Sequence, residues 1–277
     1  MRIIAFQNLK GGTGKTTSVI SIAAYLAFNK NQRVLILDCD PQGNIKESFG
    51  LRKPEYTMYD LIISDMLLED CIINARKSEG RGLIDCIISD NTLAACEMQL
   101  VSMPRREEVL KLRMRNVDGY DFILTDCSPS LSILNQNALL YAQDLVIPIS
   151  MDYLAMLGAT QIIDNLHMIQ KYFEKTVQIA GIIPTFFNGR TNMSKEVLKA
   201  LHDTYGEKVL PAVRIDTKIQ QASSARTTIY EYANTSRGAE DYALVTEALL
   251  GNRDYVREAA GIEADESTKE DDMNDAA

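Results

Sequence analysis

Residues 9–17 read L-K-G-G-T-G-K-T-T and follow the apolar run Ile3-Ile4-Ala5-Phe6 after two residues. Glycines at positions 11, 12 and 14 let the backbone adopt conformations that other residues avoid and approach phosphate oxygens closely. After the loop, apolar residues recur on one side of an expected helix, whose N-terminus offers unpaired N–H groups to an anion. The stretch therefore predicts a strand, a phosphate-binding loop and a helix, and with them a nucleotide site.

This loop departs from the general pattern G-x-x-x-x-G-K-[ST], because Leu9 replaces the first glycine and Lys10 adds a second lysine. The form x-K-G-G-x-G-K-[ST]-T resembles the deviant Walker A motif of P-loop NTPases in the ParA, MinD and nitrogenase iron protein group. In that group the additional lysine reaches the nucleotide of a second subunit. The resemblance implies that Lys10 acts across a homodimer that forms with ATP.

Apolar segments alternate with helical patterns along the chain. Strands are expected at residues 3–6, 33–37, 83–88, 120–126, 145–149 and 177–183, with a short one near 208–213. After the first helix, helices are expected at residues 57–80, 93–112, 158–173, 193–204 and 238–250. This alternation predicts an α/β fold, a mainly parallel twisted sheet with helices on both faces. A ligand then lies at the carboxyl ends of the strands.

Three carboxylates follow buried strands at that edge. The segment D-C-D-P-Q-G-N at 38–44 resembles the switch segment of ParA proteins, which implies that Asp40 positions the attacking water and that Asp38 lies near the metal. Asp126 fits the Walker B carboxylate, and Thr16 the hydroxyl that binds Mg²⁺. The expected catalytic residues are Lys10, Lys15 and Asp40, and the expected metal residues are Thr16, Asp126 and Asp38, with ATP and Mg²⁺ as cofactors. The expected ATP-binding residues are Lys10, Gly11, Gly12, Thr13, Gly14, Lys15, Thr16 and Thr17.

Further motifs extend the resemblance over residues 2–250. They are D-C-S-P-S-L at 126–131, N-A-L at 137–139, G-R-T-N at 189–192, and Tyr232 with S-R-G-A at 236–239. The chain is thus similar to the short ParA/Soj-type partition ATPases. The resemblance implies an ATP-dependent DNA-segregation ATPase for a plasmid, chromosome or mobile element. Such a protein dimerises on ATP, binds DNA nonspecifically, and hydrolyses ATP weakly until a ParB-like centromere-binding protein stimulates it.

One segment of the family pattern is rewritten. Where ParA relatives show I-P-R-N-x-R-L-x-E-A-P-S-x-G, residues 213–226 place Arg214 at the proline, Gln221 at the glutamate and Arg226 at the glycine. The resemblance therefore does not identify which residues of this segment contact adenine. The family's DNA-binding arginines align with Arg190 and Lys218, and contacts of such cations to phosphate are independent of base sequence.

Composition narrows the class of protein further. The net charge is −9, and residues 262–277 carry seven acids against one lysine, so this tail holds −6 and the remainder −3. We expect a single P-loop ATPase domain over 1–261 and a disordered acidic tail over 262–277. Five cysteines without a C-x-x-C pair, and no apolar run of about 18 residues, predict a reduced cytoplasmic protein that does not span a membrane. The resemblance to partition ATPases implies that this protein associates with the nucleoid.

Two other members of the same loop class are alternatives. A MinD-like positioning ATPase would act on a protein or membrane cargo and needs a basic amphipathic helix near the C-terminus, which the acidic tail disfavours. An iron-protein-like function needs two cysteines per subunit at a shared cluster. Cys39 and Cys127 lie beside the predicted site but lack that context, so we interpret both as small buried hydrophobes.

Overall fold

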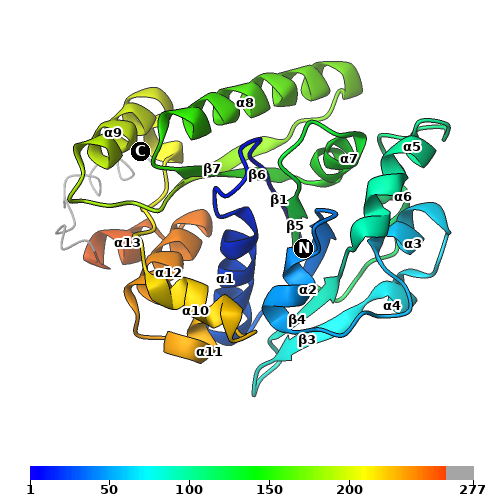
Figure 1. Ribbon diagram of the computed structural model, residues 1–277, viewed down its shortest axis with the longest axis horizontal. Coiled ribbons are helices and arrows are strands. Elements are labelled where there is room, and N and C mark those ends of the chain that lie inside the picture. The colour runs from blue at the N-terminus through cyan, green and yellow to red at the C-terminus, as the bar shows by residue number, and fades with distance from the viewer. Residues whose placement is uncertain (260–277) are drawn as a thin grey trace, which may run out of the picture.

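A seven-stranded sheet in the order β3-β4-β2-β5-β1-β6-β7 forms the centre of the molecule (Figure 1). The computed structural model describes residues 1–259, so the expected tail at 262–277 lies outside the described residues. All neighbouring strands are parallel except β3 and β4, which confirms the predicted α/β fold. The strands are β1 (Arg2–Phe6), β2 (Arg33–Cys39), β3 (Ile73–Lys77), β4 (Leu83–Ile87), β5 (Phe122–Cys127), β6 (Asp144–Ser150) and β7 (Gln178–Thr185).

Helices cover both faces of this sheet because successive side chains of a buried strand point to opposite faces. In β1, Ile3 and Ala5 belong to the core beneath α3, α5, α6, α7, α8 and α9, whereas Ile4 and Phe6 pack with α1, α2 and α12. Figure 1 shows α8 on one side of the sheet and α1 with α10 to α13 on the other. The helices are α1 (Lys15–Phe28), α2 (Asn44–Phe49), α3 (Met58–Ile63), α4 (Leu68–Cys71), α5 (Cys96–Leu100), α6 (Val109–Arg113), α7 (Ile133–Tyr141), α8 (Tyr153–Phe173), α9 (Asn192–Tyr205), α10 (Thr217–Ser224), α11 (Ile229–Ala233), α12 (Arg237–Leu249) and α13 (Arg253–Ala259), with 3₁₀ turns η1 (Asn91–Ala95) and η2 (Gly206–Lys208).

The predictions for three segments were wrong, because the structure has other elements there. The expected helix at 57–80 divides into α3, α4 and the antiparallel edge strand β3, and Asp65 between the two helices has a φ of 58°, which ends a right-handed helix. The expected helix at 93–112 is interrupted by turns between α5 and α6, where Arg105 has a φ of 52°. Residues 208–213 form no strand but only an isolated bridge from Val209 to Ile182. Short apolar runs do not distinguish these outcomes without their tertiary partners.

Other predictions agree more closely with the structure. The expected helices at 193–204 and 238–250 correspond to α9 and α12, and the expected helix at 158–173 begins earlier, at Tyr153. All five cysteines are buried and free. Among residues 1–259, no helix combines the length and apolar character needed to cross a bilayer.

Candidate nucleotide site

The glycine-rich loop connects β1 to α1 and is held from below by β7. Gly12 and Gly14 have φ values of 74° and 82°, a region that glycine enters without steric cost. The Thr185 hydroxyl at the end of β7 donates to the Thr13 carbonyl at 2.9 Å. No acid lies in the first turn of α1, so its N-terminal N–H groups keep their attraction for an anion.

A cleft of about 680 Å³ opens over this loop. Six of the eight residues expected to bind ATP line it: Gly11, Gly12, Gly14, Lys15, Thr16 and Thr17. Of the other two, Thr13 is fully buried beneath the loop. Lys10 points elsewhere, as described below. The cleft also contains Asp40, so the structure brings the predicted loop and the predicted switch segment together.

Two buried carboxylates lie behind Thr16, which lines the cleft. Asp38 on β2 and Asp126 on β5 are direct neighbours in the sheet, and the Thr16 hydroxyl donates to Asp126 Oδ2 at 2.7 Å. Asp38 Oδ2 and Asp126 Oδ1 are buried without a hydrogen-bond partner among the described residues. Burial is the main cause that raises the pKa of both carboxyls. The pKa of Asp126 is raised to about 7, although the hydrogen bond from Thr16 and the charge of Lys15 lower it.

This donor set fits a hard divalent cation, which prefers carboxylate and hydroxyl oxygens. Within residues 1–259, no group of three His, Cys, Asp or Glu side chains forms a complete metal cage. Mg²⁺ usually takes one or two carboxylates and completes its shell with waters and phosphate oxygens. Thr16 and Asp126, joined by their hydrogen bond, and Asp38 beside them are therefore the candidate residues for such an ion.

The segment after β2 holds Asp40 in a rigid turn. Asp40 N–H donates to Asp38 Oδ1 at 3.1 Å, and Asp40 Oδ1 accepts from Gln42 N–H at 3.0 Å. The Ser89 hydroxyl, just beyond β4, donates to the Asp40 carbonyl. Gly43 has a φ of 64° and lies so close to this neighbour that an added Cβ would be 3.0 Å from the Ser89 carbonyl. The Asp40 carboxylate is thus fixed at the cleft wall, where it can orient a water.

The two lysines of the loop have different surroundings. Lys15 Nζ donates to the Lys10 carbonyl at 3.3 Å, and burial lowers its pKa, although Asp126 and Asp40 act in the opposite direction. Lys10 Nζ instead pairs with Asp152 of its own chain at 2.6 Å. Asp152 also caps α8 by accepting from Ala155 N–H at 3.1 Å. Sequence reasoning missed Asp152, and its only local signal was an acid at the end of an apolar strand.

A second cavity, of about 330 Å³, lies beside the loop and is lined by Gly14, Thr17, Phe186 and much of residues 213–223. The rewritten segment therefore does face the nucleotide region. Arg214 lines this cavity too, but its guanidinium forms a paired contact with the buried Asp241, with Nη2 to Oδ1 at 2.7 Å. The same carboxylate accepts from the Arg214 N–H at 2.8 Å. Asp241 thus holds both the backbone and the side chain at the position where relatives carry proline.

The two predicted DNA-binding residues follow segments that pair with each other. Phe187 N–H donates to the Val213 carbonyl at 2.9 Å, and Arg190 and Lys218 follow within a few residues on either side. Both cations are exposed. The Lys218 ammonium lies 5.7 Å from the centre of the Tyr232 ring. Arg237 of the S-R-G-A motif is another exposed cation. Burial opposes ionisation of the nearby Asp216, but backbone hydrogen bonds from Lys218 and Gly238 and the charges of Arg237 and Lys218 lower its pKa overall.

Comparison with known proteins identifies the relatives of this arrangement. A family model described as an AAA domain matches residues 1–179. The sporulation initiation inhibitor protein Soj of Bacillus subtilis is 34% identical over 255 residues, which cover 91% of this chain and 99% of Soj. The chromosome partitioning protein ParA of Caulobacter vibrioides is 30% identical and covers 94% of this chain and 98% of its own. Among solved structures, cobyrinic acid a,c-diamide synthase from Mycobacterium smegmatis with bound ADP and magnesium has a TM-score of 0.76 at 28% identity, covering 92% and 96% of the two chains.

Proposed function

Since this chain belongs to the ParA/Soj family of partition ATPases, we propose that it is an ATP-dependent DNA-segregation ATPase that dimerises on ATP and binds DNA nonspecifically. The observation that carries this proposal is the contact of Thr16 with Asp126 at the base of the phosphate loop, beside two unpartnered carboxylate oxygens. A hydroxyl and two acids so placed suit a nucleotide with its magnesium ion. The single ATPase unit expected over 1–261 is part of the same proposal.

In this site, residues 11–17 would bind the phosphates of ATP, and Thr16 with Asp126 and Asp38 would hold Mg²⁺. The bound ion supplies neutralisation of phosphate charge. Lys15 would pair with the same phosphates, because it lines the cleft together with the loop glycines. Asp40 would orient the attacking water from the opposite wall. These roles need positioning and charge rather than covalent chemistry, as is general for phosphoryl transfer.

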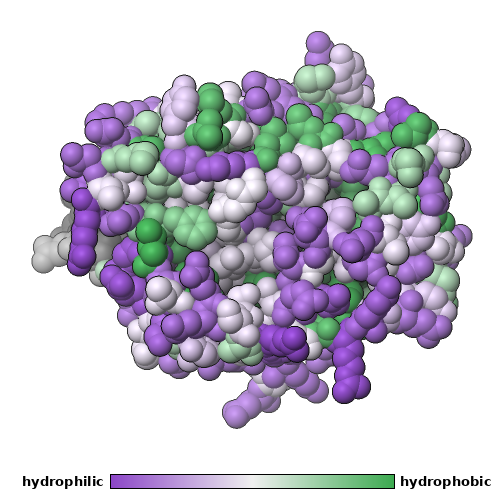
Figure 2. Space-filling view, viewed as in Figure 1, coloured by the Kyte–Doolittle hydropathy of each residue, from purple (hydrophilic) through white to green (hydrophobic). Residues whose placement is uncertain are grey.

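Dimerisation would free Lys10 from Asp152. The side chains of Lys10 and Asp152 are each about one-third exposed, so their ion pair is weak. Lys10 could therefore leave Asp152 for a phosphate of the nucleotide in a second subunit at little cost in free energy. Next to Asp152, Tyr153, Leu154 and Leu157 are exposed on α8. Figure 2 shows that the surface is mainly hydrophilic and that apolar side chains gather over α8. An apolar surface beside the loop supports a second copy of this chain as its partner.

DNA binding would use Arg190 and Lys218 on the segments joined at Phe187 and Val213. Phosphate contacts from a few cations on each subunit would add in a dimer, which explains why ATP would switch on DNA binding. A ParB-like centromere-binding protein would stimulate hydrolysis, which we expect to be weak in its absence. We expect this chain to lie in the cytoplasm and to associate with the nucleoid.

The test is binding of the purified protein to unrelated DNA sequences with ATP, ADP or no nucleotide, at two salt concentrations. We expect binding with ATP alone, and a steep decrease in affinity with salt. Dimers that form with ATP but bind no DNA would contradict the DNA-segregation function. That result would favour the alternative, a MinD-like positioning ATPase with a protein or membrane cargo.

A further inference from the structure

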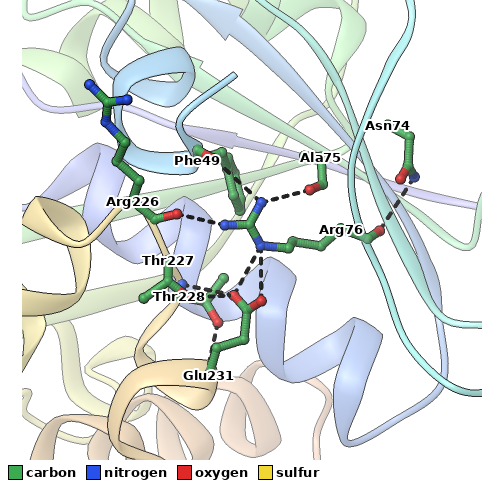
Figure 3. Close-up of polar contacts among 8 residues, drawn as sticks. All are labelled: Phe49, Asn74, Ala75, Arg76, Arg226, Thr227, Thr228 and Glu231. Atoms are coloured by element: carbon green, nitrogen blue, oxygen red, sulfur yellow. Dashed lines mark hydrogen bonds and ion pairs between the residues drawn. The ribbon is translucent and has the colours of Figure 1, made fainter. Parts of the chain in front are cut away.

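One arginine side chain joins three parts of the fold that lie far apart in sequence (Figure 3). Arg76, on the edge strand β3, donates through Nε to both carboxylate oxygens of Glu231 at 2.9 and 3.1 Å. Its Nη2 donates to the Arg226 carbonyl at 2.6 Å, and its Nη1 donates weakly to the Phe49 carbonyl at 3.4 Å. The guanidinium also lies 5.3 Å from the centre of the Phe49 ring. Arg76 thus contacts the end of α2, the end of α10 and the start of α11.

Both α2 and α10 border the nucleotide cleft. Helix α2 begins at Asn44, directly after the Asp40 turn, and its Ser48 lines the cleft together with Ser223 of α10. The Ser48 and Ser223 hydroxyls are 3.3 Å apart. Lys218 is one residue from the other end of α10. Helix α10 therefore connects the cleft wall to a proposed DNA contact.

The C-terminal end of α10 is clamped against α2. Arg226 has a φ of 58°, and its N–H donates to the Ser223 carbonyl while Thr227 N–H donates to the Ala222 carbonyl, a Schellman ending that usually has glycine at this place. Arg226 packs so closely on Gly50, the residue after α2, that an added Cβ there would be 2.9 Å from Arg226 Cδ. Arg226 therefore connects the end of α10 to the end of α2 by direct packing.

Glu231 ties α11 into the same cluster. It accepts from Thr228 N–H at 2.9 Å and, with Thr228, forms a capping box at the start of α11. Burial opposes its ionisation, but the Thr228 hydrogen bonds and the charge of Arg76 lower the pKa of Glu231 overall. One carboxylate thus serves the helix cap and the arginine together.

We propose that Arg76 is a positioning residue that couples the nucleotide state of the Asp40 turn to the DNA-binding segment 217–231. Through Phe49 it holds the end of α2, and through the Arg226 carbonyl and Glu231 it holds α10 and α11 in one orientation relative to α2. A conformational change at the Asp40 turn then moves α2 and α10 together, and with α10 it moves Lys218. This inference rests on the proposed function, in which Lys218 contacts DNA.

The test compares wild-type protein with Arg76→Met, which removes the donors but keeps most of the aliphatic stem. Amide hydrogen exchange of residues 217–231 is measured with and without a nonhydrolysable ATP analogue, together with nucleotide affinity and DNA affinity. The matched control is Arg81→Met, because Arg81 forms an exposed ion pair with Asp121 on the same hairpin but does not contact α10 or α11 among the described interactions. If Arg76→Met does not fold, Glu231→Gln is measured instead, since its amide oxygen still accepts from Thr228.

We expect the analogue to slow exchange of this segment in wild type and in the control. In Arg76→Met, exchange without nucleotide should be about tenfold faster, and the slowing by the analogue should be lost. Nucleotide affinity should change less than threefold, while DNA affinity with ATP should fall at least fivefold. Retained slowing in the variant, or no slowing in wild type, would overturn the inference. If wild type binds no DNA, the proposed function fails, but the exchange result still decides the role of Arg76.

Discussion

Replacing Asp126 by asparagine removes a buried negative charge and keeps an oxygen that can accept from Thr16. Burial, with Asp40 adding to it and Thr16 and Lys15 opposing, raises the pKa of Asp126 from 3.8 to about 7. At about 1.4 kcal/mol for each pKa unit, the rise from 3.8 to about 7 corresponds to about 4 kcal/mol of folding free energy. We therefore expect Asp126→Asn to be more stable than wild type when no cation is bound.

The sign follows from proton linkage. A carboxyl with a raised pKa keeps its proton in the folded protein at pH values where the unfolded chain has released it. For Asp126 the free energy of unfolding of wild type therefore falls as the pH rises from about 4 to about 7. The advantage of the variant should be about 2 kcal/mol at pH 5 and about 4 kcal/mol at pH 8.

The assay is urea unfolding with chelator at both pH values, repeated with ADP and Mg²⁺. Nucleotide with Mg²⁺ should stabilise wild type strongly and Asp126→Asn weakly, because the variant lacks the ligand charge. As a control, Asp121→Asn should lower stability at pH 8, since hydrogen bonds from Arg33 N–H and Arg81 outweigh burial and lower the pKa of Asp121. An advantage of Asp126→Asn that is absent at pH 8, or equal at both pH values, would refute the reasoning.

Four other changes test the proposed roles. Lys15→Ala should weaken ATP binding at least about 100-fold, because charge-assisted phosphate contacts are lost, and calorimetry showing wild-type affinity would contradict the role in phosphate binding. Asp40→Ala should bind ATP and DNA normally but lose at least about 100-fold in phosphate release, and normal turnover would exclude water positioning. Asp152→Asn keeps the cap of α8 but removes the ion pair with Lys10, which is worth about 0.5–1 kcal/mol per subunit. Sedimentation should therefore show ATP-dependent dimers that are about 5- to 30-fold tighter, and weaker dimers would contradict the role of Lys10 across the dimer. Arg190→Glu with Lys218→Glu should abolish DNA binding and keep the ATP dimer, and unchanged DNA affinity in a filter assay would place the DNA surface elsewhere.

Those parts of the site that depend on short stretches of sequence could be predicted. The phosphate loop follows β1, Asp38 and Asp126 lie near the carboxyl ends of β2 and β5, and parallel strands bring these ends to one edge. Local pattern and global fold therefore specify the same position for these residues. For the same reason the buried strands β1, β2 and β5 were correctly assigned, since continuous apolar runs mark strands covered on both faces.

Contacts between distant segments could not be predicted in this way. The pairing of Lys10 with Asp152 joins residues 142 positions apart, and that of Arg76 with Glu231 joins residues 155 apart. Nothing in the neighbourhood of Arg76 distinguishes it from a solvated arginine of an exposed hairpin. The edge strand β3 was missed for a related reason, because its burial pattern is mixed and its hydrogen bonds come from β4 alone.

The rewritten segment at 213–226 shows how such contacts change the meaning of a departure from a family motif. From the sequence alone, Arg214 in place of proline and Arg226 in place of glycine add two cations beside a nucleotide site. In the structure Asp241 engages the Arg214 side chain and backbone, so this cation is neutralised and its position is fixed. Arg226 takes the left-handed conformation that glycine adopts more easily, at a cost of about 1 kcal/mol, and Arg76 offsets this cost by binding its carbonyl. The departures of this segment from the family motif must therefore be considered together with their distant partners, Asp241 for Arg214 and Arg76 for Arg226.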